Sequence, residues 1–272
     1  MIGLIRFTNR EFELLKQYMG KQYGIDLSKK RTIAECRMSP ELEKHGISSL
    51  KQYMELMEAD RSGRLRTILL NRLTTNYTYF FREPKHFEFL EKKILPEVKP
   101  EPGRFVYRIW SAGCSSGEEC YTLAMLLQDY TDRGGWLPDF EILGTDLSEK
   151  AVRKAREGSY PVKELENIPA RWQKKYCKKD GNGENFAIHA ALREKVRFQT
   201  MNLMKPNAGI GRYDLILCRN VMIYFDEESR KKLVENLYRA LKPEGYLFVG
   251  HTELLPRNHE LFEYVCPAVY RK

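Results

Sequence analysis

The chain of 272 residues contains no uninterrupted apolar run of about 18 residues or more, which is the length that a helix needs to cross a bilayer. Its first ten residues include Arg6 and Arg10, and no apolar stretch of the kind found in secretion signals follows them. We therefore expect a soluble protein that works in the cytoplasm and does not insert into a membrane.

Cysteine pairs are also missing, because no two of the six cysteines form a Cys-x-x-Cys motif and no histidine lies at the spacing of a zinc ligand. Free thiols in a reducing compartment, without a bound metal, are the simplest interpretation. The five histidines are dispersed along the chain, so a Ser-His-Asp set for nucleophilic catalysis cannot be assembled from the sequence.

The charge is unbalanced, because Lys plus Arg (46) exceed Asp plus Glu (37) by 9. This excess is compatible with nucleic acid, an anionic membrane surface or an acidic protein partner, and charge alone does not distinguish them. Residues 1–84 carry 15 Lys and Arg against 10 Asp and Glu, with basic groups at 29–31 and at 61, 64 and 66.

The first third of the chain has helical periodicity from Thr8 to about Ile94, without strand-like alternation. Signals for helix ends divide it: a capping box at Thr8 and Glu11, a cap followed by proline at Ser39 and Pro40, and C-terminal caps at Gly24 and Gly46. We predict an all-helical domain over residues 1–95, followed by a linker at 96–104 that is rich in proline.

Residues 105–272 alternate short apolar runs with helical patterns, which predicts a parallel α/β sheet with helices on both faces. The expected strands are Phe105 to Trp110, Phe140 to Gly144, Val196 to Thr200, Tyr213 to Cys218 and Tyr246 to Val249, with one or two closing strands in Phe262 to Lys272. The polar segment at about 160–195 interrupts this order, and its Gly181-Asn182-Gly183 run is typical of a hairpin turn. We interpret it as an inserted β-subdomain.

The first expected strand opens into a loop of small residues, from Ser111 to Gly117, and then into a helix from about Glu118 to Tyr130. Small residues let the backbone approach a ligand closely. The spacing matches neither the dinucleotide fingerprint nor the phosphate loop of nucleotide hydrolases, which argues against a pyrophosphate or triphosphate ligand. The alternative is a tight turn that binds nothing.

Asp146 stands at the carboxyl end of the next expected strand, where nucleoside-binding α/β proteins place a carboxylate on ribose hydroxyls. Asp146 could instead cap the following helix, although Ser148 is available for that role. We therefore favour Asp146 as a ribose ligand.

Four long motifs of this sequence resemble those of the CheR methyltransferases, and they occur in the expected order. They are the runs 73–83, 110–119, 218–226 and 241–245 with 249–253. The resemblance implies a helical N-terminal domain and a class I, Rossmann-like methyltransferase domain with a β-subdomain insertion. It also implies S-adenosylmethionine (SAM) as cofactor, S-adenosylhomocysteine (SAH) as product and the glutamates of methyl-accepting chemotaxis receptors as acceptors, in a chain expected to be a monomer.

Carried over motif by motif, the resemblance implies a cofactor site between the two domains. Its residues would be Asn76, Thr78, Arg82, Gly113, Glu118, Asp146, Asn202, Leu203, Arg219 and Asn220.

We predict catalytic roles for Arg82 and Tyr224. Methyl transfer to a carboxylate is an in-line displacement that needs no general base, since the acceptor is already ionised at neutral pH. The Arg82 guanidinium can orient the acceptor carboxylate or close the site, and the Tyr224 hydroxyl can orient the methyl group or the carboxylate. The alternatives are a solvated arginine and a core aromatic residue.

Two other functions remain open at this stage. A nucleic-acid methyltransferase fits the positive charge, and Asn220 to Tyr224 is superficially similar to a base-methylating loop, but the prolines of that loop are missing. A SAM-binding module without catalysis would have lost its acceptor site. We further hypothesise that basic N-terminal helices recognise the receptor, without dependence on a receptor tail that adds a strand to the β-subdomain.

Overall fold

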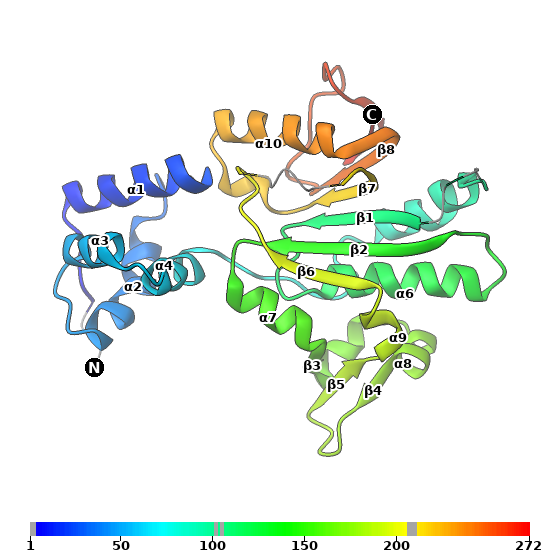
Figure 1. The fold of residues 1–272 in the computed structure, drawn as a ribbon, viewed down its shortest axis with the longest axis horizontal. Coiled ribbons are helices and arrows are strands. Elements are labelled where there is room, and N and C mark those ends of the chain that lie inside the picture. The colour runs from blue at the N-terminus through cyan, green and yellow to red at the C-terminus, as the bar shows by residue number, and fades with distance from the viewer. Residues whose placement is uncertain (1–3, 101–102, 104–105, 206–210) are drawn as a thin grey trace.

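The computed structural model describes residues 4–100, 103, 106–205 and 211–272, which form a small helical lobe beside a larger lobe built on a sheet (Figure 1). The helical lobe consists of α1 (Asn9–Tyr23), α2 (Arg31–Lys44), α3 (Leu50–Ala59) and α4 (Arg64–Leu73). These helices bury a core of their own. Among the described residues, no helix combines the length and the apolar character needed to cross a membrane.

The predicted helix ends are confirmed at α1 and corrected in α2. Thr8 and Glu11 form the capping box, and Gly24 ends α1 with a left-handed backbone. Ser39 and Pro40, in contrast, lie inside α2 and do not begin a helix. The helix continues through them because Met38 and Leu42 lie on one face of it, and both side chains are fully buried in the core. Burial of that face outweighs the local signal of a cap.

The apolar core divides between Leu73 and Phe80, ahead of the linker expected at 96–104. Phe80 already packs into the core of the sheet lobe. The short helical elements that follow, α5 (Pro84–Phe89), η1 (Leu90–Ile94) and η2 (Leu95–Glu97), contribute to the same core. Residues 101, 102 and 104 of the expected linker lie outside the described part of the chain.

The sheet lobe contains the predicted α/β sheet. Its seven strands are ordered β6-β2-β1-β7-β8-β10-β9. The first five strands are parallel to one another, and β10 pairs antiparallel with both β8 and β9. The strands are β1 (Val106–Ala112), β2 (Asp139–Asp146), β6 (Val196–Thr200), β7 (Tyr213–Cys218), β8 (Leu241–Val249), β9 (Glu263–Cys266) and β10 (Val269–Arg271). All the expected strands are present, although Phe105 lies outside the described residues.

Helices cover both faces of the sheet, as predicted. Figure 1 shows α10 (Glu227–Ala240) on one side and α6 (Glu118–Asp132) with α7 (Glu149–Glu157) on the other. Successive residues of β1 point to opposite faces, so that Ile109 belongs to the core beneath α6 and Trp110 to the core beneath α10.

The predicted β-subdomain is confirmed as a separate three-stranded antiparallel sheet of order β3-β5-β4. It is formed by β3 (Ser159–Pro161), η3 (Val162–Asn167), α8 (Ala170–Tyr176), β4 (Cys177–Lys179), β5 (Asn185–Ile188) and α9 (Ala190–Arg193). The expected hairpin turn joins β4 to β5, with Gly183 in a left-handed conformation.

The two lobes are joined by direct contacts as well as by the chain. Ile25 pairs with Phe225 in an isolated antiparallel bridge, and the Asp26 amide donates to the Tyr224 carbonyl at 2.8 Å. Just after the end of β6, the Asn202 side chain donates to the carbonyl of Gln22 in α1 at 2.8 Å. The segment after α1 is thereby fixed against the carboxyl ends of the sheet strands.

We expect Gly24→Ala to destabilise the protein. Gly24 has a φ of +70°, and a Cβ there would lie 2.7 Å from Phe225 and 2.9 Å from Ser229. The left-handed backbone alone costs alanine about 1–2 kcal/mol. The measurement is the midpoint of thermal unfolding, with Gly20→Ala in the same helix as the control. Gly20 has open space around it, so its replacement should leave the midpoint unchanged or higher, and equal effects at both positions would contradict the prediction.

Candidate functional site

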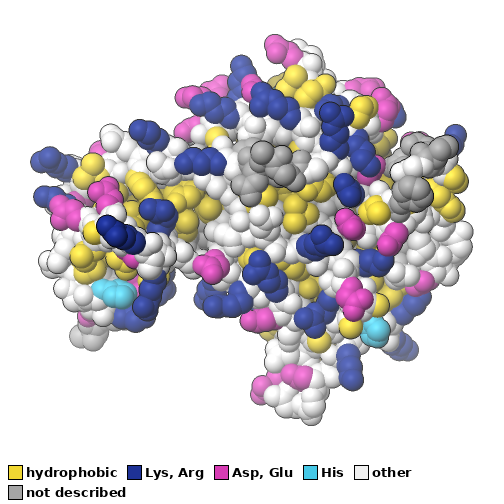
Figure 2. Space-filling model, viewed as in Figure 1, with side chains coloured by type: hydrophobic (Ala, Val, Ile, Leu, Met, Phe, Trp, Pro, Cys, Tyr) yellow, Lys and Arg dark blue, Asp and Glu magenta, His cyan; other side chains and the backbone are white. Residues whose placement is uncertain are grey.

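A cavity of about 340 Å³ lies between the lobes, within the size range of small-molecule sites. Its walls come from the segment after α1, from α2, from the chain that crosses between the lobes and from the carboxyl ends of the sheet strands. Hydrophobic side chains gather where the helical lobe meets the sheet lobe (Figure 2). Nine of the ten expected cofactor residues line this cavity, the exception being Glu118, and Tyr224 lines it too.

The strand order explains why these residues meet. The chain winds outward from β1 through β2 to β6 and then crosses to β7 on the other side of β1, and ligands of open α/β sheets bind at such a reversal. Gly113 follows β1, Asp146 ends β2, and Arg219 follows β7. Residues that are far apart in the sequence thus lie along one edge of the sheet.

Gly113 is required by the shape of the loop. Its φ is +95°, and a Cβ at this position would lie 2.3 Å from the Val221 side chain. The amides of Gly113 and Cys114 both donate to the Thr145 carbonyl, at 2.7 and 2.8 Å. The loop therefore holds its backbone at the cavity wall, where no side chain separates it from a ligand.

Asp146 lies at the cavity wall, and its side chain does not cap α7. Its carboxylate accepts hydrogen bonds from the amides of Ser115 at 2.9 Å and Ser148 at 2.8 Å, and it lines the cavity. Ser148, as expected, is the residue that caps α7, by accepting from the Ala151 amide. Burial raises the pKa of Asp146, while the amide donors oppose that rise. Each carboxylate oxygen keeps a lone pair with which it can accept from a ligand hydroxyl.

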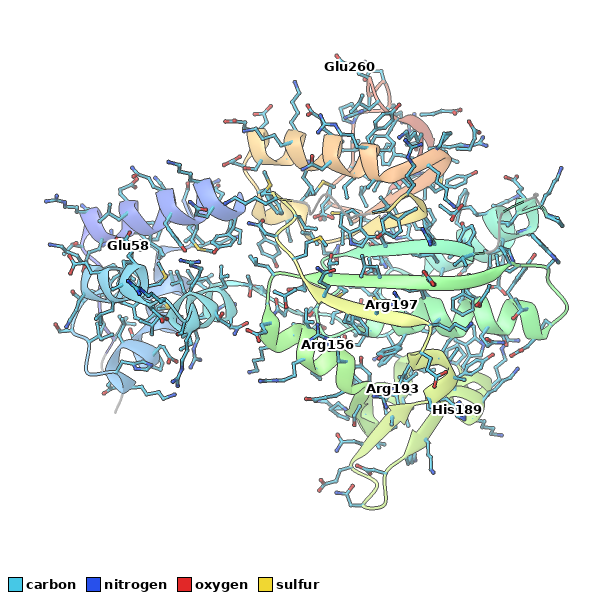
Figure 3. The ribbon with its side chains drawn as sticks, in the orientation of Figure 1. Glu58, Arg156, His189, Arg193, Arg197 and Glu260 are labelled. Carbon is cyan, nitrogen blue, oxygen red and sulfur yellow. The ribbon has the colours of Figure 1, made fainter. Side chains whose placement is uncertain are left out.

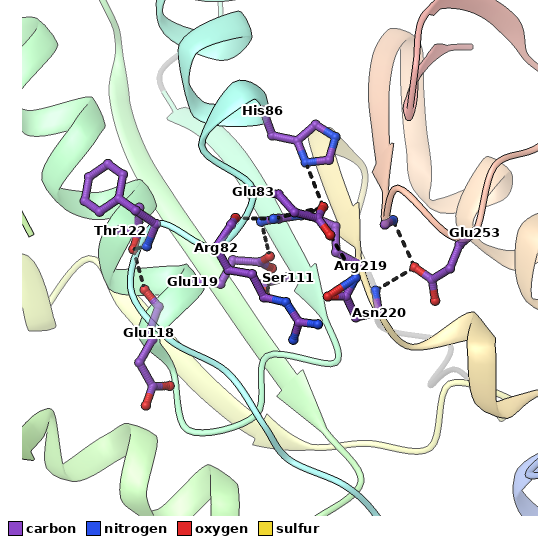
Figure 4. A network of polar contacts seen from close by, with 12 residues as sticks. Arg82, Glu83, His86, Ser111, Glu118, Glu119, Thr122, Arg219, Asn220 and Glu253 are labelled. Carbon is purple, nitrogen blue, oxygen red and sulfur yellow. Dashed lines mark hydrogen bonds and ion pairs between the residues drawn. The ribbon is translucent and has the colours of Figure 1, made fainter. Parts of the chain in front are cut away.

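Glu118 does not line the cavity, and its neighbour Glu119 does. Helix α6 begins at Glu118, and consecutive helical residues point about 100° apart. Glu119 consequently turns toward Arg219 and Ser111, with contacts of 2.8 and 2.6 Å, whereas Glu118 points away from them (Figure 4). The sequence shows two adjacent glutamates after Gly117 and does not indicate which of them faces a ligand.

Glu118 instead lies in a buried polar group beneath the β-subdomain. It is 1% exposed, it accepts from the Ser116 hydroxyl at 2.8 Å, and the nearest cation, the Lys154 ammonium, is 4.0 Å away. Burial raises the pKa of Glu118 to about 7. Its side chain is thus positioned to affect stability rather than to contact a ligand in the cavity.

Arg82 and Tyr224 both line the cavity. Arg82 is not the solvated arginine, nor Tyr224 the core aromatic residue, of the alternative interpretations. Arg82 is half-buried, donates to the Tyr77 carbonyl at 2.8 Å and lies 5.9 Å from the Tyr79 ring, so it is not simply solvated. Tyr224 is half-buried and has the Lys30 ammonium 4.4 Å above its ring. It is therefore a cavity wall residue, not a core aromatic.

Three charged residues of the cavity were not predicted as site residues from the sequence: Lys30, Arg37 and Glu119. Lys30 was seen only as part of a basic run, and Arg37 carried no motif at all. The Arg37 guanidinium donates to the Thr74 carbonyl at 3.0 Å and to the Thr75 hydroxyl at 3.2 Å. It thereby attaches α2 to the chain that crosses between the lobes.

Asn220 provides a test of whether a cofactor fits. Its backbone amide donates to Glu253 at 2.6 Å and its side-chain amide to Glu83 at 3.1 Å. Its side-chain oxygen is buried and has no hydrogen-bond partner among the described residues. Buried acceptors are rarely left unpaired, so an N–H or O–H group of a ligand would supply the missing hydrogen bond to this oxygen. With the Asp146 carboxylate in the same walls, this part of the cavity suits a ligand rich in hydrogen-bond donors.

One further group of side chains resembles a metal site in composition only. Glu83, His86 and His251 are three possible ligands within 4.8 Å of one another. Glu83 is already bound by Arg219 and Asn220, and the two histidine rings stack at 12° with centroids 5.0 Å apart. The lone pairs of nearly parallel rings do not converge on one point, so we propose no metal there.

The parallel sheet with a cavity at its strand ends is typical of ligand-binding α/β proteins. Comparison with known proteins shows that this one is a SAM-binding methyltransferase and identifies its family. The family model described as the CheR methyltransferase SAM binding domain matches residues 76–270, and the one described as the CheR methyltransferase all-alpha domain matches residues 10–74. This chain belongs to the CheR methyltransferase family, as the four motifs predicted. The expected enzyme class and the expected cofactor, SAM, are confirmed.

Two similar relatives span nearly the whole chain. The chemotaxis protein methyltransferase of Borreliella burgdorferi is 39% identical, over 98% of this chain and 96% of its own length. Chemotaxis protein methyltransferase 1 of Pseudomonas aeruginosa is 34% identical, over 97% of this chain and 98% of its own length.

We predict that Asp146→Ala weakens the binding of SAM and SAH by at least about tenfold, since a hydrogen bond to a charged group contributes about 1.5–3 kcal/mol. Isothermal titration calorimetry with SAH measures the effect. Asp139→Ala, at the exposed start of the same strand, is the control. An unchanged dissociation constant in a folded Asp146→Ala protein would return Asp146 to a purely structural role.

A second prediction concerns pH. Because the pKa of Glu118 is about 7 in the folded protein and 4.5 ordinarily, the folded protein holds a proton between these values that the unfolded chain releases. The free energy of unfolding therefore falls as pH rises from 4.5 to about 7. Glu118→Gln lacks this loss, so its stability relative to the unchanged protein should be greater at pH 8 than at pH 5. Thermal unfolding at both pH values measures it, with the exposed Glu157→Gln as control; a difference independent of pH would refute the prediction.

Proposed function

We propose that this methyltransferase transfers methyl groups from SAM to glutamate side chains of chemotaxis receptors, forming methyl esters. The observation that carries this proposal is the charge of the cavity. Among the described residues that line it, four are cationic and two are carboxylates: Lys30, Arg37, Arg82 and Arg219 against Glu119 and Asp146. A positive cavity attracts an anionic acceptor. The names of the relatives support chemotaxis as the setting.

We propose that the cofactor is held at the strand ends by Gly113, Glu119, Asp146 and Asn220. When bound, it supplies a methyl group on a positively charged sulfur. Glu119 offers that positive charge a partner, Asp146 accepts from ribose hydroxyls, and the Asn220 oxygen accepts from an N–H or O–H. These residues would hold the cofactor in a fixed orientation, and the two lobes around the cavity would exclude water.

We propose that Arg82 holds the acceptor carboxylate. Its planar guanidinium matches a carboxylate, stays charged, and faces the cavity from the chain that crosses between the lobes. No general base is required, since a glutamate is ionised at neutral pH. Orientation of the acceptor oxygen and exclusion of water are the contributions needed from the protein, and such effects supply up to about 7–11 kcal/mol. We propose that the Tyr224 hydroxyl, which also belongs to the cavity wall, orients the same carboxylate.

The basic groups expected to recognise a receptor differ in their surroundings. Lys30 lines the cavity and Arg31 pairs with Glu35 at 3.2 Å, so residues 29–31 do not form one free face. Arg61, Arg64 and Arg66 are all exposed at the start of α4. We propose that this second group contacts the acidic helices of a receptor, while Arg156, Arg193 and Arg197 lie on the sheet lobe outside the cavity lining (Figure 3).

The experiment uses the full chain with SAM labelled in its methyl group. A receptor cytoplasmic fragment, with and without its C-terminal tail, is compared with RNA and DNA as acceptors. We expect label in both receptor fragments, released as methanol by mild alkali because carboxylate esters hydrolyse readily. Label only in nucleic acid, or an alkali-stable label, would overturn the proposal. If removal of the tail abolished all transfer, recognition through the helical lobe would be contradicted.

Arg82→Ala tests the acceptor role in the same assay. Loss of one charged hydrogen bond, about 1.5–3 kcal/mol, predicts a fall in kcat/KM for the receptor of roughly tenfold to a hundredfold. Affinity for SAH should fall less. Lys85→Ala, at an exposed position three residues into the same segment, is the control. Undiminished transfer by Arg82→Ala would remove Arg82 from the site.

A further inference from the structure

The backbone on both sides of Arg82 is strained. Phe81 has a φ of 60° and Glu83 a φ of 57°, so both occupy the left-handed region, which bulky residues without glycine's freedom rarely adopt. Such strain persists only where the surroundings enforce it, and it is concentrated at functional sites. The described chain has four other non-glycine residues with positive φ, but none of them forms a pair around a single residue.

Arg219 is the main group that enforces this conformation. Its guanidinium donates to the Arg82 carbonyl and, from two nitrogens, to the Glu83 carboxylate at 3.2 and 3.3 Å. The Phe81 amide is satisfied separately, by the Thr122 hydroxyl at 3.3 Å. The Arg219 side chain is only 3% exposed. Its contacts with the segment are therefore protected from water, which strengthens them.

The same guanidinium also reaches the sheet lobe on its other side. It donates to Glu119 at 2.8 Å, and Glu119 accepts from Ser111 at 2.6 Å (Figure 4). The Phe87 ring lies 5.4 Å from the guanidinium. A buried arginine between two carboxylates is thus fixed at both ends, and the Arg82 backbone is fixed with it.

The Arg82 guanidinium is not part of this ion-pair group. It donates to the Tyr77 carbonyl and lies 5.8 and 5.9 Å from the rings of Tyr77 and Tyr79. Tyr77 is 72% exposed although it lines the cavity. The Arg82 backbone therefore sets where this side chain starts, and the contacts with Tyr77 and Tyr79 set where its guanidinium lies.

We propose that Arg219 and Glu83 are positioning residues, which hold the strained backbone of Arg82 so that its guanidinium meets the acceptor carboxylate. The inference rests on the proposed function, because it assumes that Arg82 contacts the acceptor. Neither residue needs to touch the acceptor. Their effect on methyl transfer should therefore disappear when the Arg82 side chain is absent.

A double-mutant cycle tests this dependence. Glu83→Gln keeps the size of the side chain but removes the charge that holds Arg219, and we expect kcat/KM for the receptor fragment to fall about tenfold. In an Arg82→Ala background the same change should alter kcat/KM by less than about twofold, since residues that act through one group are not additive. Binding of the receptor fragment in the presence of SAH, measured by calorimetry, should show the same pattern without turnover.

The controls separate positioning from general damage. Glu88 lies at an exposed position of α5, the helix that begins directly after Glu83, and it pairs with Lys92. Glu88→Gln should leave both measurements unchanged. Affinity for SAH and the unfolding midpoint report whether Glu83→Gln is folded; should it be unfolded, Arg219→Lys replaces it in the cycle. Equal effects in both backgrounds, or normal transfer by folded Glu83→Gln, would overturn the inference. If Arg82→Ala itself transfers normally, it is the acceptor role proposed for Arg82 that fails, and the transfer of methyl groups to the receptor stands.

Discussion

Parallel pairing of β1 with β2 on one side and with β7 on the other is the interaction on which the site depends. Parallel strands in register end at the same edge, and the chain reverses its direction of winding between these two neighbours. Gly113, Asp146 and Arg219 reach one cavity for that reason alone. The helical lobe then covers this edge, held by the pairing of Ile25 with Phe225.

The second constraint is the cost of burying charge. Arg219 is buried between Glu83 and Glu119, which compensate its charge and fix its orientation. Glu118, one residue earlier in the helix, has only a distant cation, and its pKa rises accordingly. The two adjacent glutamates therefore differ in their surroundings: Glu119 lies at the wall of the cavity, and Glu118 is buried inside the protein.

Family membership and physical chemistry support each other at this site. The family models name a SAM-binding domain and an all-alpha domain, and the cavity lies where the two meet. The unpaired Asn220 oxygen and the Asp146 carboxylate in the cavity wall are independent of that match. They indicate a ligand that donates hydrogen bonds.

The sequence by itself determined the helix caps at Thr8 and Gly24, the order of the strands along the chain, the hairpin of the β-subdomain and the family with its cofactor. These follow from local patterns or from long motifs. Only the tertiary structure decided that Glu119 and not Glu118 faces the cavity, that Ser39 and Pro40 lie within α2, and that Lys30 and Arg37 enter the site. The physical reason is that burial and the orientation of side chains depend on which distant segments pack together, and no local pattern contains that information.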